Sequence, residues 1–149
     1  MRAVLTRVKS AAVTRNGTGE LLGSIGKGFL VLIGVHEEDT EREAEKIAQK
    51  ICTMRIFEDE NGKMNIGPQD AGAQLLLVSQ FTLWADCRSR RPGFSHAARP
   101  EKAVPLYEKV ISLCREQGFQ VETGEFGADM LVTSENDGPV TILLDTREL

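Results

Sequence analysis

Two nearly unbroken apolar runs limit the folds that are open to this chain of 149 residues. The runs are Phe29–Val35 and Leu75–Val78, and continuous apolar residues of this kind are typical of strands covered on both faces. Between them, Thr40 and Glu43 have the spacing of a capping box, and apolar side chains then recur at helical intervals up to Met54. We therefore expect a strand, a helix and a second buried strand at the centre of the chain.

Strand patterns precede this centre. Residues 2–9 alternate between apolar and polar side chains, which predicts a strand with one face in water. The turn-rich segment Asn16–Gly19 separates residues 11–15 from residues 21–25 and favours a hairpin.

A second helix pattern and further strands follow the centre. The helix begins at Pro100 or at Val104 and ends near Gln117, with Gly118 suited to its C-cap. Short strands are expected at 119–123, 130–134 and 140–144. Because strands follow one another at both ends, we predict an α+β fold: a single domain, residues 1–149, with curved or stacked β-sheets and two main helices packed on one face.

Composition and cysteine content favour a cytoplasmic protein. The chain is 41% hydrophobic and 27% charged, and no apolar stretch approaches the ~20 residues of a membrane span. Its first residues lack the pattern of a secretory signal. The three cysteines are far apart and form no C-x-x-C motif, as expected in a reducing compartment.

Motifs for metals and common cofactors are missing from the sequence. The two histidines, His36 and His96, have no metal-ligand spacing with each other or with a cysteine. There is also no glycine-rich phosphate loop and no G-x-S-x-G motif. We therefore predict no metal and no cofactor.

One basic segment stands out in a chain of net charge −4. Residues 87–100 contain Arg88, Arg90, Arg91 and Arg99 but no acidic residue. Such a loop can bind a stretch of phosphate, or it can be a solvated loop that forms salt bridges with acidic neighbours. The aromatic ring in this segment, Phe94, could stack on a base or anchor the loop to the core.

Polar residues follow the second apolar run directly. Ser79, Gln80, Phe81 and Thr82 place two hydroxyls and a carboxamide at a strand end. Such a turn can aim hydroxyl or main-chain N–H groups at a carbonyl, each donor stabilising an oxyanion by about 3 kcal/mol. Alternatively, it is an ordinary turn whose side chains satisfy the local backbone. A Ser or Thr nucleophile would need a base, and neither histidine lies in a recognisable triad pattern.

Two further segments are candidates for a binding site. Gly138–Pro139 precedes the last apolar run and could present a rigid main-chain acceptor, or it could form a tight turn. Phe126, Ala128 and Met130 surround small residues before a strand and could form the wall of a pocket, or belong to the core.

Taken together, these segments resemble the D-aminoacyl-tRNA deacylases, formerly called D-tyrosyl-tRNA deacylases. The matching motifs occur in the family's order and cover nearly the whole chain: Arg55-Ile56-Phe57 with Gly62–Asn65, Val78–Leu83, Arg91-Pro92-x-Phe94-Ser95, Gly124-x-Phe126-x-Ala128-Asp129-Met130 and Asn136–Thr141.

The resemblance implies a homodimeric hydrolase that cleaves the ester between a D-amino acid and the 3′-terminal adenosine of tRNA, and also glycine mischarged onto tRNA(Ala). It implies that a cis Gly138–Pro139 unit reaches into the partner's active site and excludes L-amino acids. For the chemistry it leaves two accounts open: Thr82 as nucleophile, or water activated with help from the 2′-OH of the adenosine while main-chain N–H groups near Phe81 and Thr82 orient the ester. The lack of a histidine base favours the second account.

The predicted site follows from these motifs. Catalytic roles are assigned to Ser79, Gln80, Phe81 and Thr82, substrate contacts to Phe126, Ala128, Met130, Gly138 and Pro139, and tRNA contact to Arg88, Arg90 and Arg91. Two alternatives remain: a non-catalytic RNA-binding module that uses the Arg88–Arg91 loop, and an esterase for small molecules with Thr82 or Ser79 as nucleophile.

Overall fold

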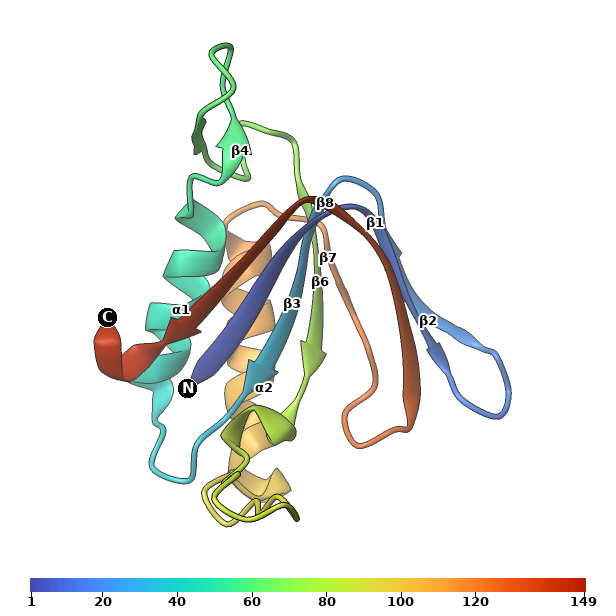
Figure 1. Ribbon diagram of the computed structural model, residues 1–149, viewed down its shortest axis with the longest axis vertical. Helices are drawn as coiled ribbons and strands as arrows, with labels where there is room; N and C mark the ends of the chain where they lie inside the picture. Colours follow the sequence, from blue (N-terminus) through green and yellow to red (C-terminus); the bar gives the residue numbers. More distant parts are fainter.

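The computed structural model describes the protein from Met1 to Leu149. Figure 1 shows two helices on one side of a strongly curved sheet, as the sequence predicted. The elements in chain order are β1 (Arg2–Arg15), β2 (Leu21–Ile25), β3 (Gly28–Gly34), α1 (Glu41–Thr53), β4 (Phe57–Glu58), β5 (Met64–Ile66), β6 (Gln74–Ser79), the 3-10 turn η1 (Phe81–Trp84), α2 (Pro100–Glu116), β7 (Val121–Thr123), β8 (Met130–Asp145) and the 3-10 turn η2 (Thr146–Glu148).

The main sheet is mixed and nearly closes on itself. Its strand order is β2-β1-β3-β6-β7, and β8 pairs with the other edge of β1. The β3–β6 and β6–β7 pairs are parallel, whereas β1 is antiparallel to each of its neighbours. The two ends of the sheet meet where β2 approaches β7: a Cβ added to Gly23 would lie 2.7 Å from the carbonyl oxygen of Thr123. Only a glycine allows this close approach.

The two apolar runs form the central strands β3 and β6. Alternate residues point to opposite faces of a strand, so these strands contribute to two cores. Phe29 and Val31 pack toward the helices, whereas Leu30, Leu76 and Val78 pack inside the curl of the sheet. Because both faces are covered, the runs are apolar without interruption.

Both helices begin where the sequence suggests. The Thr40 side chain accepts a hydrogen bond from a main-chain N–H of the first turn of α1, and Glu43 accepts the Thr40 N–H at 2.7 Å. Of the two predicted starts for α2, the structure has Pro100, and Pro105 lies within the helix. Neither helix is long and apolar enough to cross a lipid bilayer.

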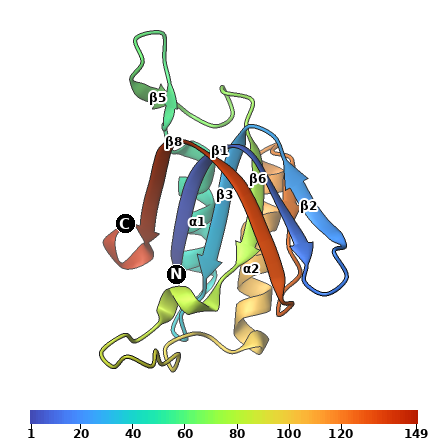
Figure 2. The same cartoon turned by 45° about the vertical axis from the view of Figure 1, so that its right-hand side comes forward.

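The C-terminal segment differs from the prediction of two separate strands. β8 is one long strand that arches together with β1 (Figures 1 and 2). Thr141 pairs with Thr6 and Asn136 with Val8, so four residues of β8 oppose the single residue Arg7. The Gly138–Pro139 unit therefore lies in a wide bulge, which lets the strand continue in the same direction instead of turning back.

The predicted wet face of β1 is also incorrect. Thr6 is 9% and Arg7 is 4% exposed, because β1 has strands on both sides and packed layers above and below. The alternation that suggested one wet face breaks between Leu5 and Val8, and that break is the sequence signal of a doubly covered strand.

Candidate functional site

The Ser79–Thr82 segment lies at the carboxyl end of β6 and turns sharply into η1. The Gln80 N–H donates to the carbonyl of Ile33 at 2.7 Å, which fastens the turn to β3. Trp84 is buried, and its Nε1 donates to the Gly34 carbonyl at 3.0 Å. A Cβ on Gly34 would lie 2.9 Å from the Gln80 carbonyl oxygen, so the turn packs directly on this glycine.

Two main-chain donors of this turn are free. The first N–H groups of a helical turn have no partner inside the turn. The Phe81 and Thr82 N–H groups are in this position, and neither makes a hydrogen bond within the chain. Both residues are exposed. The turn therefore offers two neighbouring N–H donors to an external acceptor such as a carbonyl oxygen.

The Thr82 hydroxyl has no base. It accepts a hydrogen bond from the Gln80 carboxamide at 2.5 Å, and no histidine or carboxylate is hydrogen-bonded to it. Ser79 is half-buried, and its hydroxyl likewise has no histidine or carboxylate partner. An unassisted hydroxyl is a weak nucleophile at neutral pH, so the geometry favours a role for the main chain of this turn.

The Phe126–Met130 segment lies at the same end of the sheet. Thr123 of β7 pairs with Leu77 of β6, which places the following residues beside the end of β6. The Met130 sulfur accepts a hydrogen bond from the Glu125 N–H, and a Cβ on Gly124 would lie 2.7 Å from it. Phe126, Ala128 and Met130 are all half-buried; Phe126 packs against the core on the helix side of the sheet, and Met130 packs against the core inside the curl.

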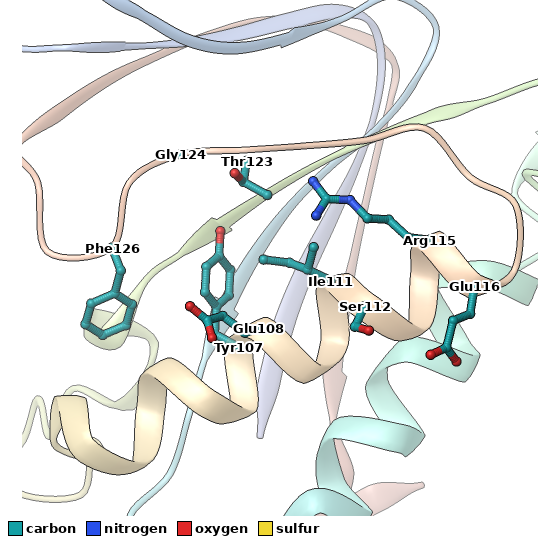
Figure 3. Close-up of a pocket in the computed structure, with 9 residues that line it drawn as sticks. All are labelled: Tyr107, Glu108, Ile111, Ser112, Arg115, Glu116, Thr123, Gly124 and Phe126. Atoms are coloured by element: carbon teal, nitrogen blue, oxygen red, sulfur yellow. The ribbon is translucent and has the colours of Figure 1, made fainter.

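A cleft of about 710 Å³ lies between α2 and this segment. Figure 3 shows Tyr107 and Arg115 projecting from α2 toward Thr123, with Phe126 at one end. The Tyr107 hydroxyl donates to the Leu77 carbonyl at 2.7 Å, and burial raises the pKa of Tyr107, so it remains a donor. Tyr107 and Arg115 were not predicted as site residues. Of the predicted residues, only Phe126 lines this cleft.

Gly138–Pro139 is held by a buried arginine. The Arg7 side chain is 5% exposed; its Nε donates to the Asp137 carbonyl at 3.1 Å and its Nη1 to the Ile56 carbonyl at 2.8 Å. The carboxylates of Glu58 and Asp137 lie 3.7 and 3.8 Å from the guanidinium. The Gly138–Pro139 peptide bond is cis, the isomer that the resemblance implies, and both residues are exposed. Sequence reasoning missed Arg7, whose signal was the broken alternation in β1.

Within one chain, the Ser79–Thr82 turn and the Gly138–Pro139 unit do not come together. Ser79 is aligned through Ile33 with Ala3, at the start of β1. The bulge is aligned with Arg7, four residues further along β1. At ~3.3 Å per residue the two segments are roughly 13 Å apart along the strands, with β1 and β3 between them. The Phe126–Met130 segment and the Ser79–Thr82 turn share one end of the sheet, and Gly138–Pro139 lies at the other.

The basic loop is fastened beside η1. Phe94 is half-buried and packs edge-on against the exposed Phe81, with the ring centres 5.0 Å apart, so it anchors the loop to η1 and not to the core as predicted. Arg88 pairs with Asp86 at 2.5 Å, and this pair lowers the pKa of Asp86 to about 2. Arg90 and Arg91 are exposed and form no ion pair. Two of the three predicted arginines are thus free for an anionic partner.

Comparisons with known proteins show the family to which the chain is related. The profile of the D-Tyr-tRNA(Tyr) deacylase family matches residues 4–145. A D-aminoacyl-tRNA deacylase of Brevibacillus brevis is 54% identical over 147 residues, which cover 98% of this chain and all of that protein. A D-aminoacyl-tRNA deacylase of Thermus aquaticus is 53% identical, covering 99% of this chain and 97% of its own length.

Solved structures share the same architecture. The c-Myc DNA unwinding element binding protein superposes with a TM-score of 0.91 at 39% identity, over 98% of this chain and 99% of the other. A probable eukaryotic D-amino acid tRNA deacylase has a TM-score of 0.84 at 16% identity, over 96% and 97% of the two chains, which indicates a common fold.

Proposed function

The chain belongs to the D-Tyr-tRNA(Tyr) deacylase family and is an ester hydrolase of D-aminoacyl-tRNA, and we propose that its reaction uses main-chain donors together with the RNA substrate. The observation that carries this proposal is the pair of free N–H groups of Phe81 and Thr82. They are two adjacent donors on an exposed turn that has no side-chain base.

In the proposed reaction, the ester carbonyl oxygen accepts hydrogen bonds from these N–H groups. Water adds to the carbonyl carbon with help from the 2′-OH of the terminal adenosine. The bond from that carbon to the 3′-oxygen then breaks. A proton from water ends on the 3′-oxygen, so the products are a free D-amino acid and tRNA with a 3′-OH. Ser79 and Gln80 set the shape of the turn, and Phe126, Ala128 and Met130 border the site.

Stereochemical selection belongs to a second copy of the chain. We propose a homodimer in which the partner subunit's Gly138 and Pro139 border the α-carbon of the amino acid. An L side chain would collide there, whereas a D side chain or the hydrogen of glycine fits, so glycyl-tRNA(Ala) is also a substrate. The separation of the two segments within one chain supports this arrangement. β8 also has an unpaired edge, with Leu131 57% and Leu143 77% exposed.

The proposed setting is chiral proofreading of translation in the cytoplasm. Arg90 and Arg91 contact phosphates of the tRNA, since both are exposed and unpaired. Arg88, already paired with Asp86, contributes less. Substituting Arg90 and Arg91 by Ala should weaken tRNA binding and reduce its dependence on salt. An unchanged salt dependence would contradict this part of the proposal.

The first experiment compares D-Tyr-tRNA(Tyr) with L-Tyr-tRNA(Tyr) and follows loss of the ester at low enzyme concentration. We expect repeated turnover of the D form only. Cleavage of both would contradict the proposed stereochemical selection, and cleavage of neither would favour the non-catalytic RNA-binding alternative. A D-Tyr-tRNA that ends in 2′-deoxyadenosine should react much more slowly; an equal rate would exclude help from the 2′-OH.

A further inference from the structure

We propose that His36, Glu37 and His96 form a binding site for a divalent transition metal of the Zn²⁺ class. One ligand atom from each of the three side chains lies within 4.8 Å of the others. The two imidazole rings are nearly parallel, 11° apart, with centres separated by 5.9 Å. Two imidazoles and a carboxylate are a donor set that suits Zn²⁺ and related ions and leaves a coordination position for water.

The backbone holds these residues in place from two loops that are distant in sequence. The Glu37 N–H donates to the His96 carbonyl at 2.9 Å, and the Ala98 N–H donates to the Val35 carbonyl at 2.9 Å. The ring of His36 packs edge-on against the buried Trp84 at 4.4 Å. The absence of metal-ligand spacing in the sequence was the basis for predicting no metal, and this pairing of loops removes that basis.

The remaining distance between the ligand atoms can close by side-chain movement. Zn²⁺ bonds to nitrogen and oxygen are about 2.0–2.2 Å long, which puts tetrahedral ligand atoms about 3.4 Å apart, so the most distant pair must close by up to roughly 1.4 Å. The side chains of His96 and Glu37 are 52% and 50% exposed, and His96 Nδ1 already lies 3.4 Å from Glu37 Oε1. His36 Nδ1 accepts the Glu38 N–H at 3.1 Å, and a metal at that nitrogen would replace this hydrogen bond.

The charges around the site favour a cation. A cleft of about 430 Å³ beside it is lined by the carboxylates of Glu37, Glu38, Asp39 and Glu43. The two permanent cations of this cleft are each already neutralised: the N-terminal amine pairs with Asp39 at 2.8 Å, and Arg147 pairs with Asp145 at 2.7 Å. Glu37 and Glu38 form no ion pair with a Lys or Arg side chain; the nearby Lys102 ammonium donates to the main-chain carbonyl of Glu37 at 2.6 Å and not to its carboxylate.

A metal at this position would connect the end of the basic loop to the segment that follows β3. His96 lies two residues after Phe94, which packs on Phe81, and His36 packs on Trp84 of the same turn. Binding would therefore restrict the Arg88–Arg91 loop next to η1. This effect on the mobility of the loop does not depend on the proposed reaction.

The test is a calorimetric titration of the full-length protein with Zn²⁺, together with NMR of the imidazole side chains. Because the chain has only two histidines, both ring signals can be followed separately. We expect one Zn²⁺ per chain and a shift of both rings. His96→Gln and Glu37→Gln should each weaken binding by at least about tenfold, the loss that even outer-shell changes cause. Hydrogen exchange in residues 87–95 should slow with Zn²⁺ in the unaltered protein and not in His96→Gln.

The matched control is Cys87→Ser, which removes an exposed thiol from the same loop and should leave affinity unchanged. Loss of binding in this variant, equal binding by His96→Gln, or no binding at all would overturn the proposed site. Zn²⁺ binding without slower exchange in the loop would overturn its role in restricting the loop. None of these readouts uses tRNA, so failure here is separate from failure of the proposed reaction.

Discussion

Arginines anchor both halves of the proposed site, but one anchor is buried and the other is at the surface. The bulge that carries Gly138–Pro139 depends on Arg7, which is 5% exposed and donates to two main-chain carbonyls. At the other end, Arg2 and Arg147 stack on Trp84, at 3.9 and 4.8 Å from its ring. These two side chains are 36% and 62% exposed.

The difference determines how firmly each half is held. Carbonyls that lose a buried donor have no water to replace it, whereas surface contacts are partly replaced by solvent. The bulge assigned to stereochemical selection is therefore fixed by the interior of the fold. The turn that carries the free N–H donors is fastened to β3 by the buried Trp84 and the Gln80 N–H, and only its arginine contacts lie at the surface.

The largest effect is expected from Arg7→Met, which keeps most of the side-chain volume and removes the guanidinium. The carbonyl of Ile56 would lose its donor in a buried position, and that of Asp137 in a partly buried one. We expect the free energy of unfolding to fall by about 3 kcal/mol, at 1–3 kcal/mol for each unsatisfied group. Urea denaturation measures this change, and selection against L-Tyr-tRNA should weaken with it.

Arg88→Ala is the matched control for the loss of an arginine. Arg88 is 89% exposed and pairs only with Asp86, so its removal should leave the urea midpoint unchanged. Equal destabilisation by the two variants would show that burial is not the reason for the strength of the Arg7 anchor.

The next effect is expected from Gly138→Ala. Gly138 has φ +126°, and an added Cβ would lie 2.8 Å from Val140 Cγ2 and 3.1 Å from Arg7 Nη2. The combined backbone and steric strain should cost about 2 kcal/mol of unfolding free energy and displace the bulge, so that turnover of D-Tyr-tRNA falls. Gly62→Ala is the control, since Gly62 has φ +73° and open space around it. If both variants lose the same stability and keep full activity, crowding at the bulge has no role.

The sequence could predict the elements that local patterns encode, but not those that depend on how distant strands pair. The buried strands β3 and β6, the capping box of α1 and the hairpin of β1 and β2 follow from local patterns, and the structure confirms them. The bulge in β8 depends on the registers of Thr6 and Val8, which local patterns do not encode. Two strands were therefore predicted where one continues.

In the site, too, features encoded by contiguous residues could be predicted, whereas contacts between distant residues could not. Ser79–Thr82 and Phe126–Met130 are contiguous motifs and could be found by reading along the chain. Arg7 reaches Ile56 and Asp137 across 49 and 130 residues, and Glu37 reaches His96 across 59, so these partners become visible only in three dimensions. The free N–H groups of the turn have no sequence signal, since every residue except proline carries one.

A smaller, pH-dependent effect is expected from Asp145→Asn at the surface anchor. Hydrogen bonds from Arg147, the main contribution, and from Arg2 hold the pKa of Asp145 well below its usual range. A carboxylate whose pKa is lowered in the folded state stabilises the fold at pH values above its unfolded pKa of about 4. This stabilisation is lost progressively as the pH falls from there toward the folded-state pKa. The variant should be about 1 kcal/mol less stable at pH 7. Urea titrations should show this gap narrowing at pH 2.5; a constant gap would contradict the ionic origin.

The smallest effect, on rate, is expected from Thr82→Ala, and it separates the two accounts of the chemistry. The substitution removes the hydroxyl that Gln80 contacts but keeps the free main-chain N–H of residue 82. If the turn acts through its main chain, turnover of D-Tyr-tRNA should stay within about tenfold of the unaltered protein, since only a positioning contact is lost. Thr82→Ser is the control that retains a hydroxyl. A loss of several orders of magnitude in Thr82→Ala with activity kept in Thr82→Ser would identify a nucleophilic hydroxyl. That result would exclude the main-chain account, even though the structure places no base beside Thr82.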